Sequence, residues 1–366
     1  MRKKFDEIFE DCTKLGTKIK TDEYHSNGKH PIIDQGQEMV AGFTDLEDGL
    51  LDAVPAIVFG DHTRIIKYVD CPFFLGADGV KVLRSKVPNA NYRYLYYALK
   101  NAKIPNTGYN RHYKWLKELE IEYPPIDQQV KTVKVLDKVE SIIYNRQNQL
   151  QKLDELVKAR FVEMFGMPGT DTKGWGLQYL GTCCELNPKK GTDKRLVSGL
   201  SVSFVPMPAV SESGKIDASQ IKAYDEVKTG FTYFAENDVL FAKITPCMEN
   251  GKGAVAVGLC NNIGFGSTEF HILRPINNKS NPYWLYSLTS FDAFRKDAAD
   301  NMTGSAGQRR VPAVFLEKYK VTLPPIELQN QFAAFVEQTD KSKVAVQKSL
   351  DEAQLLFDSL MQQYFG

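Results

Sequence analysis

Apolar side chains recur at spacings of three and four residues in two long stretches of the chain, residues 123–166 and 323–366. The apolar positions of the first stretch are Leu136, Val139, Ile143, Leu150, Leu153, Val157 and Met164. Two hundred positions later the same seam reads Val336, Thr339, Lys343, Val346, Leu350, Ala353, Phe357, Leu360 and Tyr364. Seven-residue spacing of this kind is typical of helices that pair as a coiled coil.

Each stretch is predicted to be one long helix. A Pro-Pro-Ile sequence opens both, at residues 124–126 and 324–326, and no further Pro occurs in either. The pair suits the start of a helix, and Gly166 suits a left-handed cap at its end. We expect the two helices to pair in antiparallel orientation, because the alternative, two helices lying separately on globular cores, predicts shorter elements.

The remaining segments, residues 1–122 and 167–322, are predicted to be mixed α/β domains. In the first, strands are expected at 54–59, 65–69 and 80–83, and a helix at 92–100, from runs of apolar and β-branched residues. The second repeats this order with longer loops. The predicted fold is α+β: two domains, a central helix at 123–166 and a C-terminal helix at 323–366, with pseudo-twofold symmetry.

Composition narrows the class of protein. A chain of 366 residues suits two domains. It contains no apolar run long enough to cross a bilayer and no signal peptide, so we expect a soluble, cytoplasmic protein without a membrane partner. Its six cysteines lack paired spacing, which predicts buried, reduced thiols. The net charge of +1 does not by itself indicate a nucleic-acid partner, so any such site depends on local clusters.

The sequence contains no recognisable catalytic or metal-binding motif. The sequence lacks a phosphate-binding loop, a dinucleotide-binding glycine motif and a nucleophile elbow. Its five histidines show no metal-ligand spacing, so a zinc site is not expected. We therefore predict a protein without catalysis of its own, with no cofactor and no metal in this chain.

One fragment keeps an enzymatic alternative open. Asn281-Pro282-Tyr283 resembles half of the motif with which amino-methyltransferases hold a flipped adenine, although the second Pro and a glycine-rich loop upstream are absent. A DNA methyltransferase fragment is therefore one alternative. The simpler interpretation makes Asn281 the N-cap of a helix and Pro282 its first residue.

Polar and basic side chains that could bind DNA lie in loops, and these loops occupy matching positions in both copies. Around Thr107-Gly108 and Thr303-Gly304, small residues precede side chains that can bind phosphate or read base edges. Further polar loops follow the strands that end near residues 59 and 242. The candidate DNA-binding residues are Lys29, His62, Thr63, Arg64, Thr107, Asn110, Arg111, Lys114, Lys243, Thr245, Lys252, Ser305, Gln308, Arg309 and Arg310.

Four features of the sequence are informative together: Pro-Pro-Ile-x-x-Gln before each helix, the run 150–166, the two Thr-Gly turns and the segment 239–246. In these features the whole chain resembles the specificity subunit of a type I restriction-modification system. Each motif is moderately specific by itself, whereas their double occurrence in register is highly specific.

The resemblance implies two target recognition domains, each reading one half of a bipartite, asymmetric site in double-stranded DNA, with the helices setting the spacer. It also implies partners: two modification subunits that methylate adenine with S-adenosylmethionine, and restriction subunits that use ATP and Mg. A coiled-coil scaffold whose globular segments bind other proteins is the second alternative.

Overall fold

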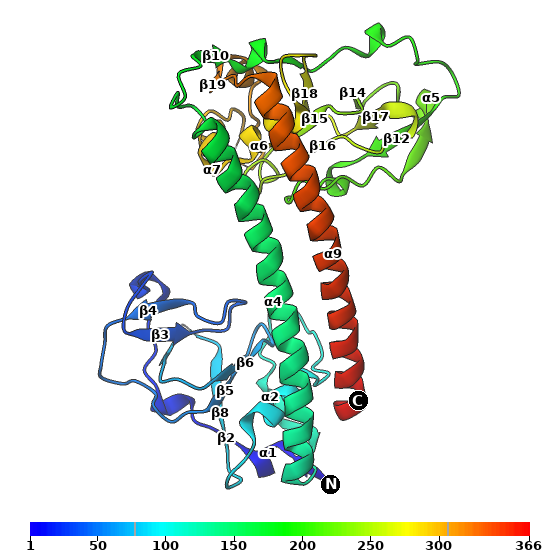
Figure 1. Cartoon of the computed structure of the whole chain (residues 1–366). Helices are drawn as coiled ribbons and strands as arrows, with labels where there is room; N and C mark the ends of the chain where they lie inside the picture. Colours follow the sequence, from blue (N-terminus) through cyan, green and yellow to red (C-terminus); the bar gives the residue numbers. More distant parts are fainter. Residues whose placement is uncertain (77, 306) are drawn as a thin grey trace. The chain divides into compact units, whose positions relative to one another are not determined.

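The computed structural model describes residues 1–76, 78–305 and 307–366, which form two compact units (Figure 1). Unit 1 comprises Met1–Gln147 and Lys348–Gly366, and unit 2 comprises Asn148–Gln347. Each unit therefore contains one α/β domain together with one half of each long helix.

Both long helices form as predicted. They are α4, Ile126–Phe165, and α9, Ile326–Phe365, each of 40 residues, and Figure 1 draws each as an unbroken ribbon. Gly166 follows α4 with a φ of 83°, the left-handed conformation that glycine adopts without steric cost.

The glutamine of the repeated Pro-Pro-Ile-x-x-Gln motif closes the start of each helix. The side-chain amides of Gln129 and Gln329 donate to the carbonyls of Pro124 and Pro324, each at 2.8 Å. Both glutamines are buried, at 1% and 0% exposure. The glutamine side chain supplies a donor to a proline carbonyl that precedes the helix, and this bond holds the chain where it enters the helix. The glutamine of the motif therefore has the same structural role in both copies.

The described residues of unit 1 form two sheets and a short two-stranded ribbon. Its strands are β1 Arg2–Lys4, β2 Phe9–Asp11, β3 His30–Ile33, β4 Gly42–Thr44, β5 Ala56–Gly60, β6 Ile66–Val69, β7 Phe74–Leu75, β8 Val80–Ser85 and β9 Glu120–Glu122. Its shorter helices are α1 Phe5–Ile8, α2 Tyr92–Lys100 and α3 Tyr113–Lys117. The sheet orders are β2-β8-β5-β6, which is antiparallel throughout, and β4-β3-β7, while β1 pairs with β9.

Unit 2 has the same plan with additions. Its strands are β10 Leu177–Tyr179, β11 Cys184–Leu186, β12 Ser201–Val205, β13 Ile221–Ala223, β14 Thr232–Ala235, β15 Val239–Ala242, β16 Gly253–Val255, β17 Ile263–Gly266, β18 Phe270–Pro275 and β19 Lys320–Thr322. Its shorter helices are α5 Tyr224–Val227, α6 Pro282–Ser290, α7 Asp292–Asp300 and α8 Ala313–Lys318. The sheet orders are β11-β18-β15-β16 and β13-β12-β17-β14, while β10 pairs with β19.

The two domains share topology and register. Ile57 pairs with Leu83 in the first four-stranded sheet, and Val239 pairs with Leu273 at the matching place in the second. Unit 2 adds a strand to its other sheet and inserts α7 before α8. The predicted duplication is thereby confirmed, and the predicted strands at 54–59, 65–69 and 80–83 appear as β5, β6 and β8 with small shifts of their ends.

Within each unit the long helices pack in antiparallel fashion into the core of the domain. In unit 1, Leu136 of α4 and Phe357 of α9 belong to one buried cluster with residues of α2. In unit 2, the rings of Phe161 and Phe332 meet with centroids 5.5 Å apart. The early part of one helix therefore meets the late part of the other in both units, as the antiparallel prediction requires.

The cysteine prediction holds only in part. All six thiols are free; Cys12, Cys183 and Cys184 are buried, and burial raises the pKa of the Cys184 thiol to about 12. Cys71 is exposed, so the expectation of a buried thiol is wrong there.

Among the described residues, no helix has the length and apolarity needed to cross a membrane, and no cluster of ligand side chains is arranged to hold a metal ion.

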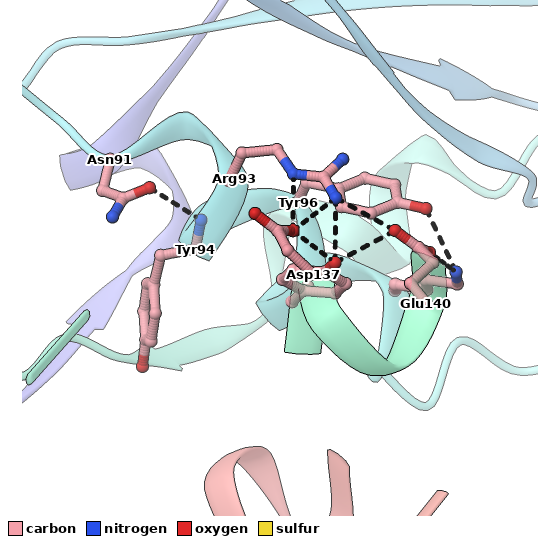
Figure 2. Close-up of polar contacts among 8 residues, drawn as sticks. Asn91, Arg93, Tyr94, Tyr96, Asp137 and Glu140 are labelled. Atoms are coloured by element: carbon pink, nitrogen blue, oxygen red, sulfur yellow. Dashed lines mark hydrogen bonds and ion pairs between the residues drawn. The ribbon is translucent and has the colours of Figure 1, made fainter. Parts of the chain in front are cut away.

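A polar network joins α2 to α4 inside unit 1 (Figure 2). The guanidinium of Arg93 donates to Asp137 at 3.0 Å and to Glu140 at 2.9 Å, and Lys100 donates to Glu140 at 2.9 Å. The Tyr97 hydroxyl lies 2.7 Å from Asp137. Only 28% of the Arg93 side chain is exposed, so these contacts are partly shielded from water.

The network shifts the pKa of Glu140. Burial by itself raises the pKa of this carboxyl group, but the Lys100 ammonium and the hydrogen bonds from Lys100, Tyr97 and Arg93 outweigh burial and hold the pKa below its ordinary value. The stabilisation is therefore complete above the unfolded-state pKa of about 4.3 and is lost as the pH falls through the lower folded-state value.

We expect Arg93→Met to lower the free energy of unfolding by about 2 kcal/mol at pH 7, because Asp137 loses its cation and Glu140 keeps only Lys100. The difference between wild type and variant should narrow as the pH falls below about 4.3, because the stabilisation of the Glu140 carboxylate is lost as that group becomes protonated. Urea unfolding across this pH range measures both effects. Arg2→Met is the matched control, since Arg2 and Glu122 form an exposed pair. A pH-independent difference would contradict this account.

Candidate nucleic-acid interface

In unit 1, two loops that are far apart in sequence form one surface. The turn after β5 meets the segment before α3, where the Asp61 carbonyl accepts from the His112 backbone N–H at 2.8 Å and from its Nδ1 at 3.0 Å. The Asp61 carboxylate accepts from the backbone N–H of Tyr113 at 2.7 Å. His112 is fully buried, at 0% exposure. This buried link fixes the base of both loops while their outer side chains stay accessible.

The turn between β5 and β6 is held in an unusual conformation. Arg64 has a φ of 63°, which is uncommon for a residue with a side chain. Its guanidinium donates to the carbonyl of Ile104 at 3.2 Å, and the Thr63 hydroxyl donates to the carbonyl of Gln35 at 2.7 Å. Strained backbone of this kind is frequent at functional sites.

The segment before α3 carries the exposed candidates Thr107, Asn110 and Arg111. The Thr107 backbone N–H donates to Nε2 of the buried His112 at 3.4 Å, which ties the loop to its anchor. Lys114 lies inside α3 and not in a loop, with its ammonium 4.8 Å from the ring centre of Trp115. The structure thus brings His62, Thr63 and Arg64 together with the 107–111 segment.

Lys29 lies elsewhere in unit 1. Its ammonium pairs with Glu47 at 2.8 Å and its backbone N–H donates to Asp45, beside the three-stranded sheet. None of its described contacts joins it to the two loops. Its role as a DNA contact stays a prediction.

Unit 2 joins the same two loops in the same way. The Lys243 carbonyl accepts from the Val311 backbone N–H at 2.9 Å, which matches the link from Asp61 to His112. Thr245 donates its backbone N–H to Arg309 at 3.0 Å, and single β-bridges pair Arg310 with Ile244 and Thr303. Sequence-distant candidates therefore meet at the same end of the four-stranded sheet in both domains.

The cations of this second surface have acidic partners within the chain. Arg310 grips Glu269 through two contacts of 2.9 Å, and hydrogen bonding from Arg310 holds the pKa of Glu269 below its ordinary value. Arg309 reaches Glu249 at 3.2 Å, while burial lowers the pKa of Lys243. Any phosphate that binds these cations must compete with carboxylates.

The other candidates of unit 2 differ in exposure. Ser305 and Gln308 are exposed on the 301–310 loop, in which residue 306 lies outside the described residues. The Lys252 ammonium donates to the carbonyl of Met207 at 3.4 Å, and none of its described side-chain contacts is with that loop. The roles of these side chains as DNA contacts stay predictions.

Sequence reasoning missed Arg295, a buried residue of α7 that is 6% exposed. Its guanidinium donates to the carbonyls of Thr289 at 2.7 Å, Met248 at 2.7 Å and Gly251 at 3.1 Å. These acceptors are uncharged, and burial lowers the pKa of Arg295 to about 10. Arg295 thereby pins the loop between β15 and β16 to α7. The signal in the sequence was an arginine next to Phe294, on the apolar face of a short helix.

The structure gives Asn281 a capping role. Its side-chain oxygen accepts from the Tyr283 backbone N–H at 2.9 Å at the start of α6, and its amide donates to Asn330 at 3.0 Å. Asn91 caps α2 in the matching way, accepting from Tyr94 at 3.1 Å. The methyltransferase alternative loses the observation on which it depended.

Several solved structures share this fold over the whole chain. The S subunit of a type I restriction-modification system from M. genitalium matches with a TM-score of 0.57 at 16% identity, covering 100% of this chain and 96% of that one. A chain from work on complex assembly and conformational transition of the type I R-M system matches with a TM-score of 0.50 at 16% identity, covering 100% and 97%. The shared fold defines a class of protein in which two tandem α/β domains are joined by two long helices.

A family model described as type I restriction modification DNA specificity domain matches residues 1–155 and 199–353. The chain therefore belongs to this family. It is 37% identical over 195 residues to the type I restriction enzyme EcoAI specificity subunit of Escherichia coli, and 36% identical over 196 residues to the EcoEI specificity subunit. The matched segments cover 51% and 52% of this chain but 32% of each relative, so the match spans about a third of the relatives' length.

Arg295→Met should leave the carbonyls of Met248 and Gly251 without their donor, and we expect the free energy of unfolding to fall by about 2 to 3 kcal/mol. Hydrogen exchange measured by mass spectrometry should show faster exchange across residues 244–252.

Lys296→Met is the matched control on the same helix. Its side chain is exposed, so we expect a change within about 0.5 kcal/mol and unchanged exchange of the loop. Equal protection of residues 244–252 in wild type and Arg295→Met would show that Arg295 does not hold the loop.

Proposed function

We propose that the chain is the non-catalytic DNA-recognition subunit of a type I restriction-modification complex, acting in the cytoplasm. The observation that carries the proposal is the repeated surface: in each domain the loop after the central strand meets the loop before the last short helix, through equivalent backbone bonds at Asp61–His112 and Lys243–Val311. Family membership gives this surface its ligand class, which is double-stranded DNA.

The two surfaces differ in side chains, so the two half-sites differ as well. The first carries Thr107, Asn110 and Arg111, and the second carries Gln308 and Arg309. Arginine pairs with guanine edges, and Asn or Gln pairs with adenine edges in the major groove. An asymmetric, bipartite site follows from a duplicated scaffold with diverged loops.

The long helices supply the remaining parts of the proposal. Because α4 and α9 each contribute to both units, their length sets the spacing between half-sites and their exposed faces dock two modification subunits. S-adenosylmethionine then belongs to those subunits, and ATP and Mg to the restriction subunits. Adenine methylation and DNA cleavage are accordingly assigned to the partners.

Methylome sequencing of the host with and without this chain tests the proposal. We expect deletion to remove one bipartite, asymmetric motif of methylated adenine and complementation to restore it. An unchanged methylome would favour a protein-binding scaffold, and a palindromic motif would contradict two different reading domains.

A paired deletion tests the role of the helices. Removing seven residues from each helix at the border of the units, 144–150 and 344–350, keeps the apolar seam in register and shortens each helix by about 10 Å. We expect the spacer of the methylated motif to shorten by about three base pairs, at ~3.4 Å per pair, with both half-sites unchanged. A folded variant that keeps the original spacer would rule this role out.

A further inference from the structure

Tyr109 is the most exposed aromatic side chain of the candidate surface in unit 1, at 86% exposure. Its ring lies flat on the ring of His62, with centroids 4.6 Å apart and planes 8° apart. The two residues come from different loops, since His62 follows β5 and Tyr109 precedes α3. The stacked pair therefore bridges the two loops at their outer side.

The backbone that carries His62 is held by Gln35. The His62 backbone N–H donates to the Gln35 side chain at 3.2 Å, and the Thr63 hydroxyl donates to the Gln35 backbone at 2.7 Å. The buried His112 anchors the other loop through Asp61. Stacking on a supported ring reduces the side-chain entropy that Tyr109 would lose on binding a ligand.

The neighbours of Tyr109 are of the kind that hold nucleic acid. Asn110 and Arg111 follow it on the exposed loop, and Arg64 lies on the facing turn. An aromatic face beside cationic and amide groups is the combination that binds unstacked bases, with the ring against the base and the cations near phosphate. The matching loop of unit 2, Thr303–Arg310, contains no aromatic residue in the sequence.

We propose that Tyr109 stacks on the face of a nucleobase that leaves the base stack within the half-site read by the first domain. His62 backs the ring as a positioning residue. The inference rests on the proposed function, because it requires a DNA half-site on this surface. It adds a contact confined to one of the two half-sites.

The test measures binding of the full chain, assembled with its modification subunits, to a duplex carrying the methylome-defined site. Tyr109→Leu should weaken binding about ten- to a hundredfold, the range measured for loss of one aromatic stacking contact. Tyr109→Phe and Tyr109→Trp should bind within about threefold of wild type, because both keep an aromatic face. Equal loss in all three variants, or no loss in Tyr109→Leu, would overturn the proposal.

Abasic substitutions identify the base. Each position of the first half-site is replaced singly, and binding of wild type and Tyr109→Leu is compared on every duplex. If Tyr109 stacks on a base, the difference between the two proteins should vanish at one position and persist elsewhere, as expected for coupled partners. A difference that persists on every duplex would show that the ring contacts sugar or phosphate and would overturn the proposal.

Two controls separate the outcomes. Tyr179→Leu removes another exposed tyrosine, 51% exposed in unit 2, and should leave binding unchanged. Thermal unfolding of Tyr109→Leu should match wild type, since the ring buries little surface. Failure of the wild-type complex to bind the methylome-defined duplex would instead refute the proposed function.

Discussion

The structure depends on the insertion of each long-helix half into the core of an α/β domain. In unit 2 the rings of Phe161 and Phe332 pack edge to face between the helices and extend to Phe291 of the domain. In unit 1 Leu136 and Phe357 share a buried cluster with α2. Because the helix pair and the domain bury the same apolar surface, neither is a separate module, and the helices fix where each domain sits on them.

The two units achieve this attachment with different chemistry. Unit 1 adds a partly buried network in which Arg93 and Lys100 of α2 neutralise carboxylates of α4 (Figure 2). In unit 2 the position that matches Arg93, two residues after the capping asparagine, is occupied by Tyr283. This tyrosine packs against the buried apolar cluster of unit 2, so aromatic packing takes the place of the ion pairs at this position. The ionic attachment depends on pH and salt, and it demands defined geometry, whereas apolar packing tolerates substitution of similar volume. Divergence after duplication has therefore changed the chemistry of attachment while keeping its place.

The loops of the candidate recognition surface are held by contacts that do not involve their outward side chains. Its loops are joined by backbone hydrogen bonds, from His112 to Asp61 and from Val311 to Lys243, and these bonds do not depend on the outward side chains. Buried supports, such as Arg295 beneath the loop between β15 and β16, fix the backbone from inside. Side chains on the outside can then vary without loss of the fold.

Local patterns by themselves determined the long helices, the duplication and the main strands, because seven-residue periodicity, the Pro-Pro-Ile-x-x-Gln motif and apolar runs act over a few turns. They also placed candidate residues in loops. Only the tertiary structure decided which loops meet, that Arg310 is held by Glu269, that Lys29 lies apart and that Arg295 is buried. These facts depend on strand pairing and on burial between residues far apart in sequence. A local sequence pattern cannot show which distant residue will form an ion pair or hydrogen bond with a given side chain.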